Sequence, residues 1–396
     1  MSGDKTLKTV SVAKCEDYER KNVESSVRRA IDLLGGIGAF VSPGQKVLVK
    51  FNLLQGADPE KCVTTHPEVV HAVAKLLKEH GCDVLLGDSP GSGIPYTASN
   101  LRKAYAASGF DRVAEELGVA LNYDVGYRDV PAPDSTTMKQ FPIINPVLDC
   151  DAVIVVSKVK THASLFVSGA AKNIFGVIPG LEKPTYHARL QTPPSFGRML
   201  VDLNEVVKPK LQIMDAVFGM EGDGPFAGSP RRIGAILASG DYSAIDVVTC
   251  RLINVDPVHA PTLAAAVERA SLREDLGDVT VIGDSWEGLV VKDYKRPAPY
   301  AGEGRRYAPA FAKIIALSRE YTLRPVIHED ICTACLKCVR SCPVKTIAVV
   351  DEKPVIDYKQ CIRCYCCHEM CDSKAISLER NEAAGEELTR LTNGSS

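Results

Sequence analysis

Eight cysteines near the C-terminal end of the chain are spaced as two copies of one motif. The first copy reads C-x2-C-x2-C-x3-C from Cys332, and the second begins 29 positions later at Cys361. This is the bacterial type of run that binds [4Fe-4S] clusters, in which three thiolates wrap one cluster and the fourth cysteine ligates the other. The spacing therefore predicts two [4Fe-4S] clusters. The predicted ligands are Cys332, Cys335, Cys338 and Cys371 for the first cluster, and Cys361, Cys364, Cys367 and Cys342 for the second.

The second copy departs from the usual pattern in two places. Cys371 is followed by Asp372, whereas a proline follows the last cysteine of the first copy. Cys366 is a ninth thiol between two ligands; we expect it to be unligated, with a spare ligand or a redox-reactive thiol as the alternatives. Zinc is the rival metal, but zinc sites usually join two C-x2-C pairs through a longer spacer. Over about 50 residues the stretch resembles a bacterial two-cluster ferredoxin.

Composition narrows the class of the whole protein. The 396 residues carry a formal net charge of −2, which argues against a general nucleic-acid binder. No apolar run is long enough for a membrane span, and the N-terminal residues lack the apolar core of a signal peptide. The five cysteines outside the repeat are scattered singly, as in a reducing compartment. We therefore expect a cytoplasmic protein that has no membrane span and binds no nucleic acid.

A segment rich in lysine and histidine follows a predicted strand in the middle of the chain. "DAVIVVSKV" (151–159) is an apolar, β-branched run that leads into "KVKTH", where alternate residues would point to one side. Open α/β sheets bind ligands at the carboxyl ends of their strands. From residue 158 to 189 there are five Lys/Arg and one acid, which suits a clamp on a carboxylate or phosphate; a solvated lysine-rich face is the alternative. The candidates are Lys158, Lys160, His162, Lys172, Asn173, Lys183 and His187.

Acidic residues near the ends of other strands are candidates for the same site. Asp215 ends an apolar run, and Glu221 and Asp223 lie in the glycine-rich "MEGDGPFAGSP". These acids could balance the lysines, hold a cation or carry protons, although turn glycines and capping aspartates explain them equally well. Asp88, in "GDSPGSG", has two interpretations as well: a substrate-facing loop or a plain strand-to-helix turn.

The segments that must position these residues alternate between strands and helices. Apolar runs predict strands at 46–54, 82–88, 151–159, 211–217, 233–240 and 279–284. Helical periodicity predicts helices at 67–81, 99–109, 198–208 and 242–253. The alternation predicts an α/β fold with a mostly parallel sheet covered by helices, followed by a small C-terminal α+β ferredoxin-like domain. We expect an α/β domain over 1–301, a linker with a helix over 302–325, a two-cluster [4Fe-4S] ferredoxin domain over 326–378 and a charged tail over 379–396.

The motifs around the candidates resemble a known family. "KVKTHASLFVSGAAKNIFGVIPGLEKPTYH", "MEGDGPFAGSP" and "SGDYSAIDV" are similar to those of the prokaryotic family called domain of unknown function 362, over roughly residues 10–300. Members are often joined to a ferredoxin, so the resemblance implies a fold and iron–sulfur redox chemistry, but no substrate. The residues that it singles out by motif match are Lys158, Lys160, His162, Lys172, Asn173, Lys183 and His187, with Asp215, Glu221 and Asp246.

Three functions fit these patterns. The first, which we favour, is an oxidoreductase that takes electrons from a soluble donor and reduces a small anionic substrate among the lysines, with His162 or His187 supplying protons. The second is an electron-transfer protein whose basic cluster docks a redox partner. The third is a non-redox α/β enzyme with structural or regulatory clusters. A metal held by the two histidines and an acid would fit the first or the third, and no motif identifies the substrate, the donor, a flavin or the oligomeric state.

Overall fold

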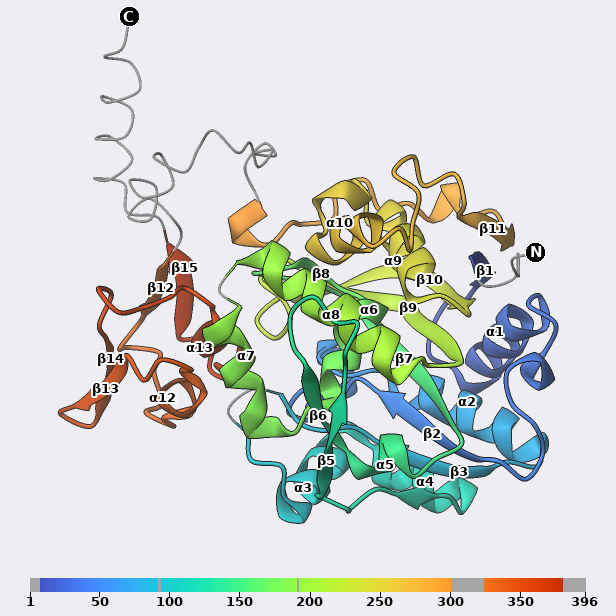
Figure 1. The fold of residues 1–396 in the computed structure, drawn as a ribbon, viewed down its shortest axis with the longest axis horizontal. Coiled ribbons are helices and arrows are strands. Elements are labelled where there is room, and N and C mark those ends of the chain that lie inside the picture. Colours follow the sequence, from blue (N-terminus) through green and yellow to red (C-terminus); the bar gives the residue numbers. More distant parts are fainter. Residues whose placement is uncertain (1–7, 92–93, 191, 301–323, 380–396) are drawn as a thin grey trace, which may run out of the picture.

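The computed structural model describes residues 8–91, 94–190, 192–300 and 324–379 (Figure 1). Nearly all of the predicted linker (302–325) and tail (379–396) lies outside the described residues. In the described part of the chain, no helix is long and apolar enough to cross a membrane.

A nine-stranded sheet forms the centre of the larger, N-terminal part, counted over the described residues. Its order is β11-β1-β10-β9-β7-β2-β3-β4, and β8 pairs with the end of β7. The strands from β9 to β4 run parallel, whereas β10 is antiparallel to both of its neighbours. The mostly parallel sheet that the sequence predicts is thus confirmed. The strands are β1 (Thr9–Lys14), β2 (Lys46–Phe51), β3 (Asp83–Gly87), β4 (Ala120–Leu121), β7 (Ala152–His162), β8 (Phe166–Ser168), β9 (Leu211–Glu221), β10 (Ser229–Ser239) and β11 (Thr280–Gly283).

Helices cover both faces of this sheet because its central strands are apolar on both sides. In β7, Ile154 and Val156 belong to the core beneath α1–α4, whereas Val153 and Val155 face the core beneath α8. The second face is completed by α6, α9, α10 and the β5–β6 hairpin (Figure 1). The elements of these layers are α1 (Arg20–Asp32), α2 (Pro67–Glu79), α3 (Ala98–Ser108), α4 (Phe110–Leu117), β5 (Tyr127–Pro131), β6 (Gln140–Ile144), α5 (Asn145–Leu148), α6 (Ala170–Asn173), α7 (Lys183–Arg189), α8 (Pro193–Val207), α9 (Tyr242–Leu252) and α10 (Pro261–Glu268).

Two element boundaries differ from the prediction for local physical reasons. Helix α8 begins at Pro193 rather than at residue 198, because Thr192 and Ser195 form a capping box and proline is favoured in the first turn. Strand β7 continues to His162 rather than ending at residue 159, because its last three residues pair with β8. The predicted basic segment therefore starts inside the sheet and not in a loop after it.

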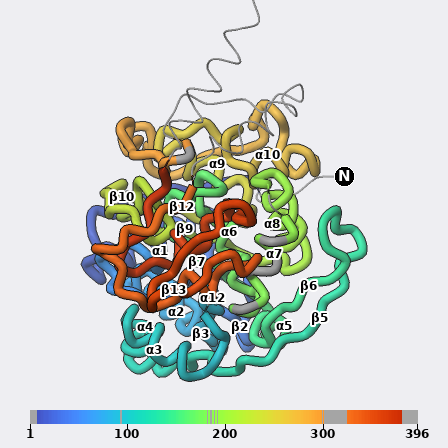
Figure 2. The backbone as a smooth tube through the Cα atoms, turned by 90° about the vertical axis from the view of Figure 1, so that its left-hand side faces the viewer, coloured from blue at the N-terminus to red at the C-terminus, as the bar shows by residue number. Residues whose placement is uncertain are grey.

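The C-terminal part is a small α+β unit, as predicted. It contains two antiparallel strand pairs, and its two short helices lie within the two cysteine motifs. In Figures 1 and 2 this part lies against the α/β part beside α7. Its elements are β12 (Arg324–Ile327), α12 (Lys337–Ser341), β13 (Ile347–Val350), β14 (Lys353–Ile356), α13 (Cys366–Glu369) and β15 (Ile376–Glu379).

Candidate functional site

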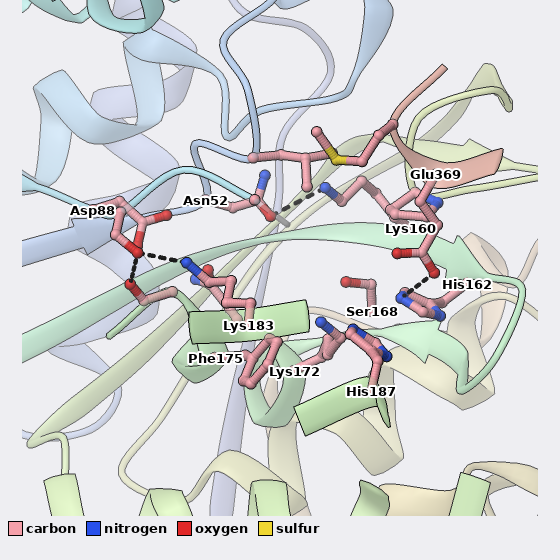
Figure 3. Close-up of a pocket in the computed structure, with 17 residues that line it drawn as sticks. Asn52, Asp88, Lys160, His162, Ser168, Lys172, Phe175, Lys183, His187 and Glu369 are labelled. Carbon is pink, nitrogen blue, oxygen red and sulfur yellow. Dashed lines mark hydrogen bonds and ion pairs between the residues drawn. The ribbon is translucent and has the colours of Figure 1, made fainter. Parts of the chain in front are cut away.

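A cavity that is open to solvent lies at the carboxyl edge of three adjacent parallel strands. Lys160 and His162 reach it from the end of β7, Asn52 follows β2, and Asp88 follows β3. Parallel strands bring their carboxyl ends to the same edge, which is where open α/β sheets bind ligands. We call it the basic cavity. The predicted candidates that line it are Lys160, His162, Lys172, Asn173, Lys183 and His187 (Figure 3).

Lys158 and Asp215 lie elsewhere, in a buried ion pair. The Lys158 Nζ is 3.0 Å from Oδ2 of Asp215, and both side chains are fully buried. Tyr18 completes the group, since its hydroxyl donates to Asp215 Oδ1 at 2.9 Å. A break in the pairing of β7 with β9 between Lys158 and Lys160 separates the environments of these two lysines. Lys158 therefore joins two strands instead of lining the basic cavity.

The remaining acidic candidates hold the backbone in place. Glu221 accepts a hydrogen bond from the backbone N–H of Lys295 at 3.1 Å, so it ties the end of β9 to a later segment. Asp246 accepts from the N–H groups of Ala170 and Ala171 at 2.6 and 3.0 Å, at the start of α6. Burial raises the pKa of Asp246 to about 7. Asp246 thus positions the short helix that presents Lys172 and Asn173 to the basic cavity.

The three cavity lysines differ in how they are held. Lys160 Nζ donates to Asn52 Oδ1 at 3.0 Å and to the backbone oxygen of Val63 at 2.8 Å. Burial, with the nearby charges of Lys172 and Lys158, lowers the pKa of Lys160 to about 7. Lys183 donates to the Ser89 hydroxyl at 2.5 Å, and burial lowers its pKa well below the ordinary range.

Lys172 is the half-buried member of this group. Its Nζ lies 4.5 Å from the ring centroid of Phe175, in cation–π contact. Burial lowers the pKa of Lys172, and the charge of Glu369 opposes that effect. The aromatic face occupies one side of the ammonium, so the hydrogens on its other sides are available for an anion. Lys172 is therefore the cavity lysine best placed to meet a ligand.

Both cavity histidines are held neutral. His162 Nδ1 accepts from the N–H groups of Ser164 and Leu165 at 3.1 and 3.3 Å, so its proton lies on Nε2. Burial and the charge of Lys172 lower the pKa of His162 well below its ordinary value. The same two causes lower the pKa of His187 to about 3, and its ring stacks on Phe196 with centroids 4.5 Å apart. Neither imidazole is a cationic acid near neutral pH.

The sequence interpretation missed Lys50, which contacts two residues that line the basic cavity. Its Nζ is 2.9 Å from Asp88 Oδ1 and 3.0 Å from Asn173 Oδ1, and its side chain is fully buried. Gly176 allows this approach, because a Cβ there would lie 2.1 Å from Asp88 Oδ1. A lysine inside the apolar run "KVLVKF" was the available signal, since buried lysines are almost always paired. Because Asp88 pairs with Lys50 and lines the basic cavity, it belongs to the site and not to a plain turn.

Glu369 is the other unpredicted member, and it comes from the C-terminal part. Its Oε1 lies 3.0 Å from His162 Nε2, and Met370 lines the basic cavity beside it (Figure 3). Burial raises the pKa of Glu369 to about 7, although Lys172 and Lys160 act in the opposite direction. No sequence signal pointed to Glu369, because it stands between cluster ligands and far along the chain from the lysines.

The cysteines are grouped as the two-cluster assignment requires. All four predicted ligands of the second cluster line one cavity with apolar residues such as Ile347 and Ile356. In the first set, burial raises the pKa of the Cys338 thiol to about 11. The charges of Cys335, Cys332 and Cys371 raise it further, because these three predicted co-ligands lie close to Cys338. The residues present therefore fit two [4Fe-4S] clusters.

Backbone groups also favour thiolates at these positions. The N–H of Thr346 points to Cys342 Sγ at 3.3 Å, and the N–H of Ala375 points to Cys371 Sγ at 3.2 Å. Hydrogen bonds to the charged form stabilise it. Cys366 is fully buried, and its hydrogen bond is the main cause that lowers the pKa of Cys364. Cys366 therefore supports a ligand through a side-chain contact.

A site for a single metal ion would need several ligand side chains grouped around one point. Among the described residues, no three His, Cys, Asp or Glu side chains are grouped so that they could hold one metal ion. The cysteine sets do not conflict with this finding, because each thiolate of a [4Fe-4S] cluster ligates a different iron. His162, His187 and Glu369 line the same cavity, but they are not grouped as ligands of one ion.

Both parts of the chain are similar to known protein families. Residues 47–251 match the family described as Domain of unknown function (DUF362), and residues 324–372 match a 4Fe-4S dicluster domain. This chain belongs to the DUF362 family. The thylakoid-associated protein sll1697 of Synechocystis sp. is 35% identical to this DUF362 protein over 292 residues, 74% of this chain and 88% of that one. The predicted fusion with an iron–sulfur domain is confirmed.

Two further similarities are more limited. The pyruvate synthase subunit PorD of Methanothermobacter marburgensis is 36% identical over 61 residues, 15% of this chain and 72% of that one. Among solved structures, the lactate racemase apoprotein from Thermoanaerobacterium thermosaccharolyticum aligns with 13% identity and a TM-score of 0.38 over 62% of this chain and 57% of that one. The match of residues 324–372 to a 4Fe-4S dicluster domain supports iron–sulfur electron transfer by the DUF362 protein.

Proposed function

We propose that this DUF362 protein is an iron–sulfur oxidoreductase that passes low-potential electrons from two [4Fe-4S] clusters to a small anionic substrate in the basic cavity. The observation that carries the proposal is the place of Glu369. It lies two residues from the ligands Cys367 and Cys371, and it lines the same cavity as Lys160 and Lys172. Cluster ligands and basic residues are thus adjacent across the boundary between the two parts.

The basic cavity suits a small anion. Lys160, Lys172 and Lys183 line it, and each of them that is protonated attracts an anion more strongly in this buried site than it would in water. The amides of Asn52 and Asn173 and the hydroxyl of Ser168 add neutral hydrogen-bonding groups. Cations placed where negative charge develops stabilise the reduction electrostatically. An unsaturated or thiolated acid is the substrate class that this arrangement favours.

Lys160 is our candidate for the proton donor. When bound, the clusters supply single electrons, and each electron that reaches an anion raises its basicity. The histidines, which the sequence suggested for this role, have lowered pKa values and stay neutral. Lys160, with a pKa of about 7, is a better-matched acid near neutral pH. His162 then offers its Nε2–H, which has no hydrogen-bond partner among the described residues, to the substrate.

The burial of the lysines separates this proposal from protein docking. A docking surface needs exposed charges that can meet those of a partner. Lys160 and Lys183 are 1% and 3% exposed. They are within reach of a small molecule that enters the cavity but not of a flat protein surface. The role of an electron carrier that docks through these lysines is therefore the weaker candidate.

The proposal is tested by reoxidation of the reduced protein. The full chain is purified anaerobically, reduced with dithionite, desalted and mixed with a panel of small unsaturated and thiolated acids, while cluster absorbance is followed. We expect one class of acid to reoxidise the clusters, and Lys160→Met and Lys172→Met to slow that reaction by at least about tenfold. Lys103→Met, at an exposed position of α3, is the matched control. Equal rates in all three variants would contradict the proposal.

A further inference from the structure

We propose that the two cluster sites have a fixed order along the electron path. The outer site, held by Cys332, Cys335, Cys338 and Cys371, receives electrons from a soluble one-electron carrier protein with a basic face. The inner site, held by Cys342, Cys361, Cys364 and Cys367, adjoins the basic cavity. This inference rests on the proposed function and adds to it a direction and a docking surface.

The second cysteine copy makes the contacts with the α/β part. The Ser164 hydroxyl, two residues beyond β7, donates to the backbone oxygen of Cys364 at 3.3 Å. The neighbouring residue, Tyr365, packs against Ala163. Glu369, at the end of α13, faces His162 at 3.0 Å. The ligand loop of the inner site therefore rests directly on the strand that supplies the cavity residues.

Three of the four outer ligands belong to the first copy, which points away from the α/β part. The fourth, Cys371, stands between Met370 and Asp372, which contact the α/β part. Over the described residues, the hydrogen bonds and ion pairs of the first copy's side chains stay within the C-terminal part, as in the pairing of Lys337 with Asp372 and the bond from Arg340 to the Cys335 backbone oxygen. Cys335 is the exposed cysteine of the eight predicted ligands, and Ile331, just before the motif, is 47% exposed. The outer site thus has an edge close to solvent, where short-range electron transfer from another protein is feasible.

The base of the β13–β14 hairpin lines the inner-site cavity, and its tip places an apolar surface with an acidic rim beside the outer edge. Val349, Val350 and Val355 of the β13–β14 hairpin are about half exposed, and the hairpin points away from the α/β part (Figure 1). The Lys353 Nζ pairs with Glu329 Oε2 at 2.6 Å, which brings the hairpin beside Ile331. We call these residues, with the loop that carries Cys335, the outer surface. Its exposed charged residues are Glu329, Asp330, Asp351, Glu352, Lys353 and Arg340, a net charge of −2.

The sign of this rim identifies the kind of partner. An apolar centre with a charged rim is the usual anatomy of a transient protein interface, and opposite charges on the partner speed the encounter. A carrier with a basic face is the occupant that complements four acids and two bases. Each encounter oxidises one carrier and delivers one electron to the outer site. Two encounters supply the two electrons that, with two protons, reduce one substrate molecule.

The order of the sites is tested by electron paramagnetic resonance with the soluble relaxation agent dysprosium–EDTA. Cys364→Ser leaves the outer ligand set intact, and Cys335→Ser leaves the inner set intact. We expect the reduced-cluster signal of Cys364→Ser to show several-fold greater relaxation enhancement than that of Cys335→Ser. Equal enhancement, or the reverse order, would overturn the assignment. This measurement requires neither substrate nor turnover.

The outer surface is tested with cytochrome c, a basic one-electron carrier protein, as the probe. The rate at which the dithionite-reduced, desalted full chain reduces cytochrome c is measured at low salt. We expect the double variant Asp351→Lys/Glu352→Lys to lower the second-order rate constant by about tenfold. Glu115→Lys, at an exposed position of α4, makes a charge change of the same kind and should leave the rate within twofold.

The outcomes separate the two proposals. An unchanged rate in the hairpin variant, or an equal loss in Glu115→Lys, would overturn the docking surface whatever the native substrate is. A failure of every acid to reoxidise the protein would contradict the proposed function. In that case the relaxation and cytochrome c measurements would still decide the order and the docking surface. If either serine variant does not assemble its remaining cluster, the cytochrome c comparison still tests the docking surface, because its variants keep all the wild-type cysteines.

Discussion

His162 and Glu369 face each other across the boundary between the two parts of the chain, with Nε2 and Oε1 3.0 Å apart. Two backbone N–H groups occupy Nδ1 of the histidine, so its ring proton lies on Nε2, close to the carboxylate but without a hydrogen bond to it. Glu369 therefore places one negative charge among the same cations that we expect to bind the substrate. The helix that contributes a cluster ligand also sets the charge of the cavity.

Removing that charge should strengthen anion binding. Glu369→Gln keeps the size of the side chain but removes the charge that competes with the anion for Lys172. We expect the affinity for sulfate, a probe anion that does not titrate near neutral pH, to rise about fivefold at pH 8. Isothermal titration calorimetry measures it, with Glu115→Gln as the exposed control. An unchanged or weaker affinity in Glu369→Gln would show that the carboxylate does not share the anion site.

The affinity for sulfate should depend on pH through Lys160. The pKa of Lys160 is lowered from its ordinary 10.5 to about 7, so this lysine is mostly neutral at pH 8 and mostly protonated at pH 6. Only the protonated form attracts an anion. We therefore expect the affinity to rise about tenfold as the pH falls from 8 to 6.

The comparison needs a background without the neighbouring carboxylate, because the pKa of Glu369 is also about 7. Calorimetry across this pH range should give a steep dependence for Glu369→Gln and a much shallower one for Glu369→Gln/Lys160→Met. The double variant Glu369→Gln/Lys103→Met should retain the steep dependence. If the sulfate affinity of all three proteins changed equally with pH, Lys160 would not be the cation that titrates.

The ion pair of Lys158 and Asp215 should matter for stability. Asp215→Ala would leave a fully buried ammonium without its counter-ion, which typically costs about 3–5 kcal/mol of unfolding free energy. Asp275→Ala removes the exposed partner of Arg273 and should cost much less, because exposed ion pairs add little to stability. Anaerobic urea unfolding followed by circular dichroism compares the two. Similar losses would mean that the buried pair is not held as the structure describes.

The iron content should follow the ligand assignment. Anaerobically purified protein should contain about eight irons and eight sulfides per chain, the content of two [4Fe-4S] clusters. Cys335→Ser should reduce the content of one cluster selectively, whereas Cys366→Ser should keep all the iron and alter the spectrum of the inner site alone. Iron and sulfide analysis with Mössbauer spectroscopy distinguishes these cases. A spectrum of Cys335→Ser identical to that of the wild type would contradict the assignment.

The sequence alone determined the cluster chemistry and the class of fold. Eight cysteines in register predict two clusters, because three ligands of each lie close together in sequence and the other motif supplies the fourth; the match to a 4Fe-4S dicluster domain agrees with this prediction. The alternation of apolar strands and amphipathic helices is equally local, and the observed parallel sheet follows from it. The basic segment at the end of β7 was also recognisable, since the carboxyl edge of a parallel sheet is a known place for ligands.

Only the tertiary structure decided which charges meet. Lys158 and Lys160 are two residues apart, yet one forms a structural ion pair and the other lines the basic cavity, because strand pairing changes between them. Lys50 joins Asp88, and Glu369 reaches His162 from more than 200 positions along the chain. Periodicity and spacing describe neighbours in sequence. A buried charge, in contrast, requires a partner in space, and the packing of the two parts alone supplies it.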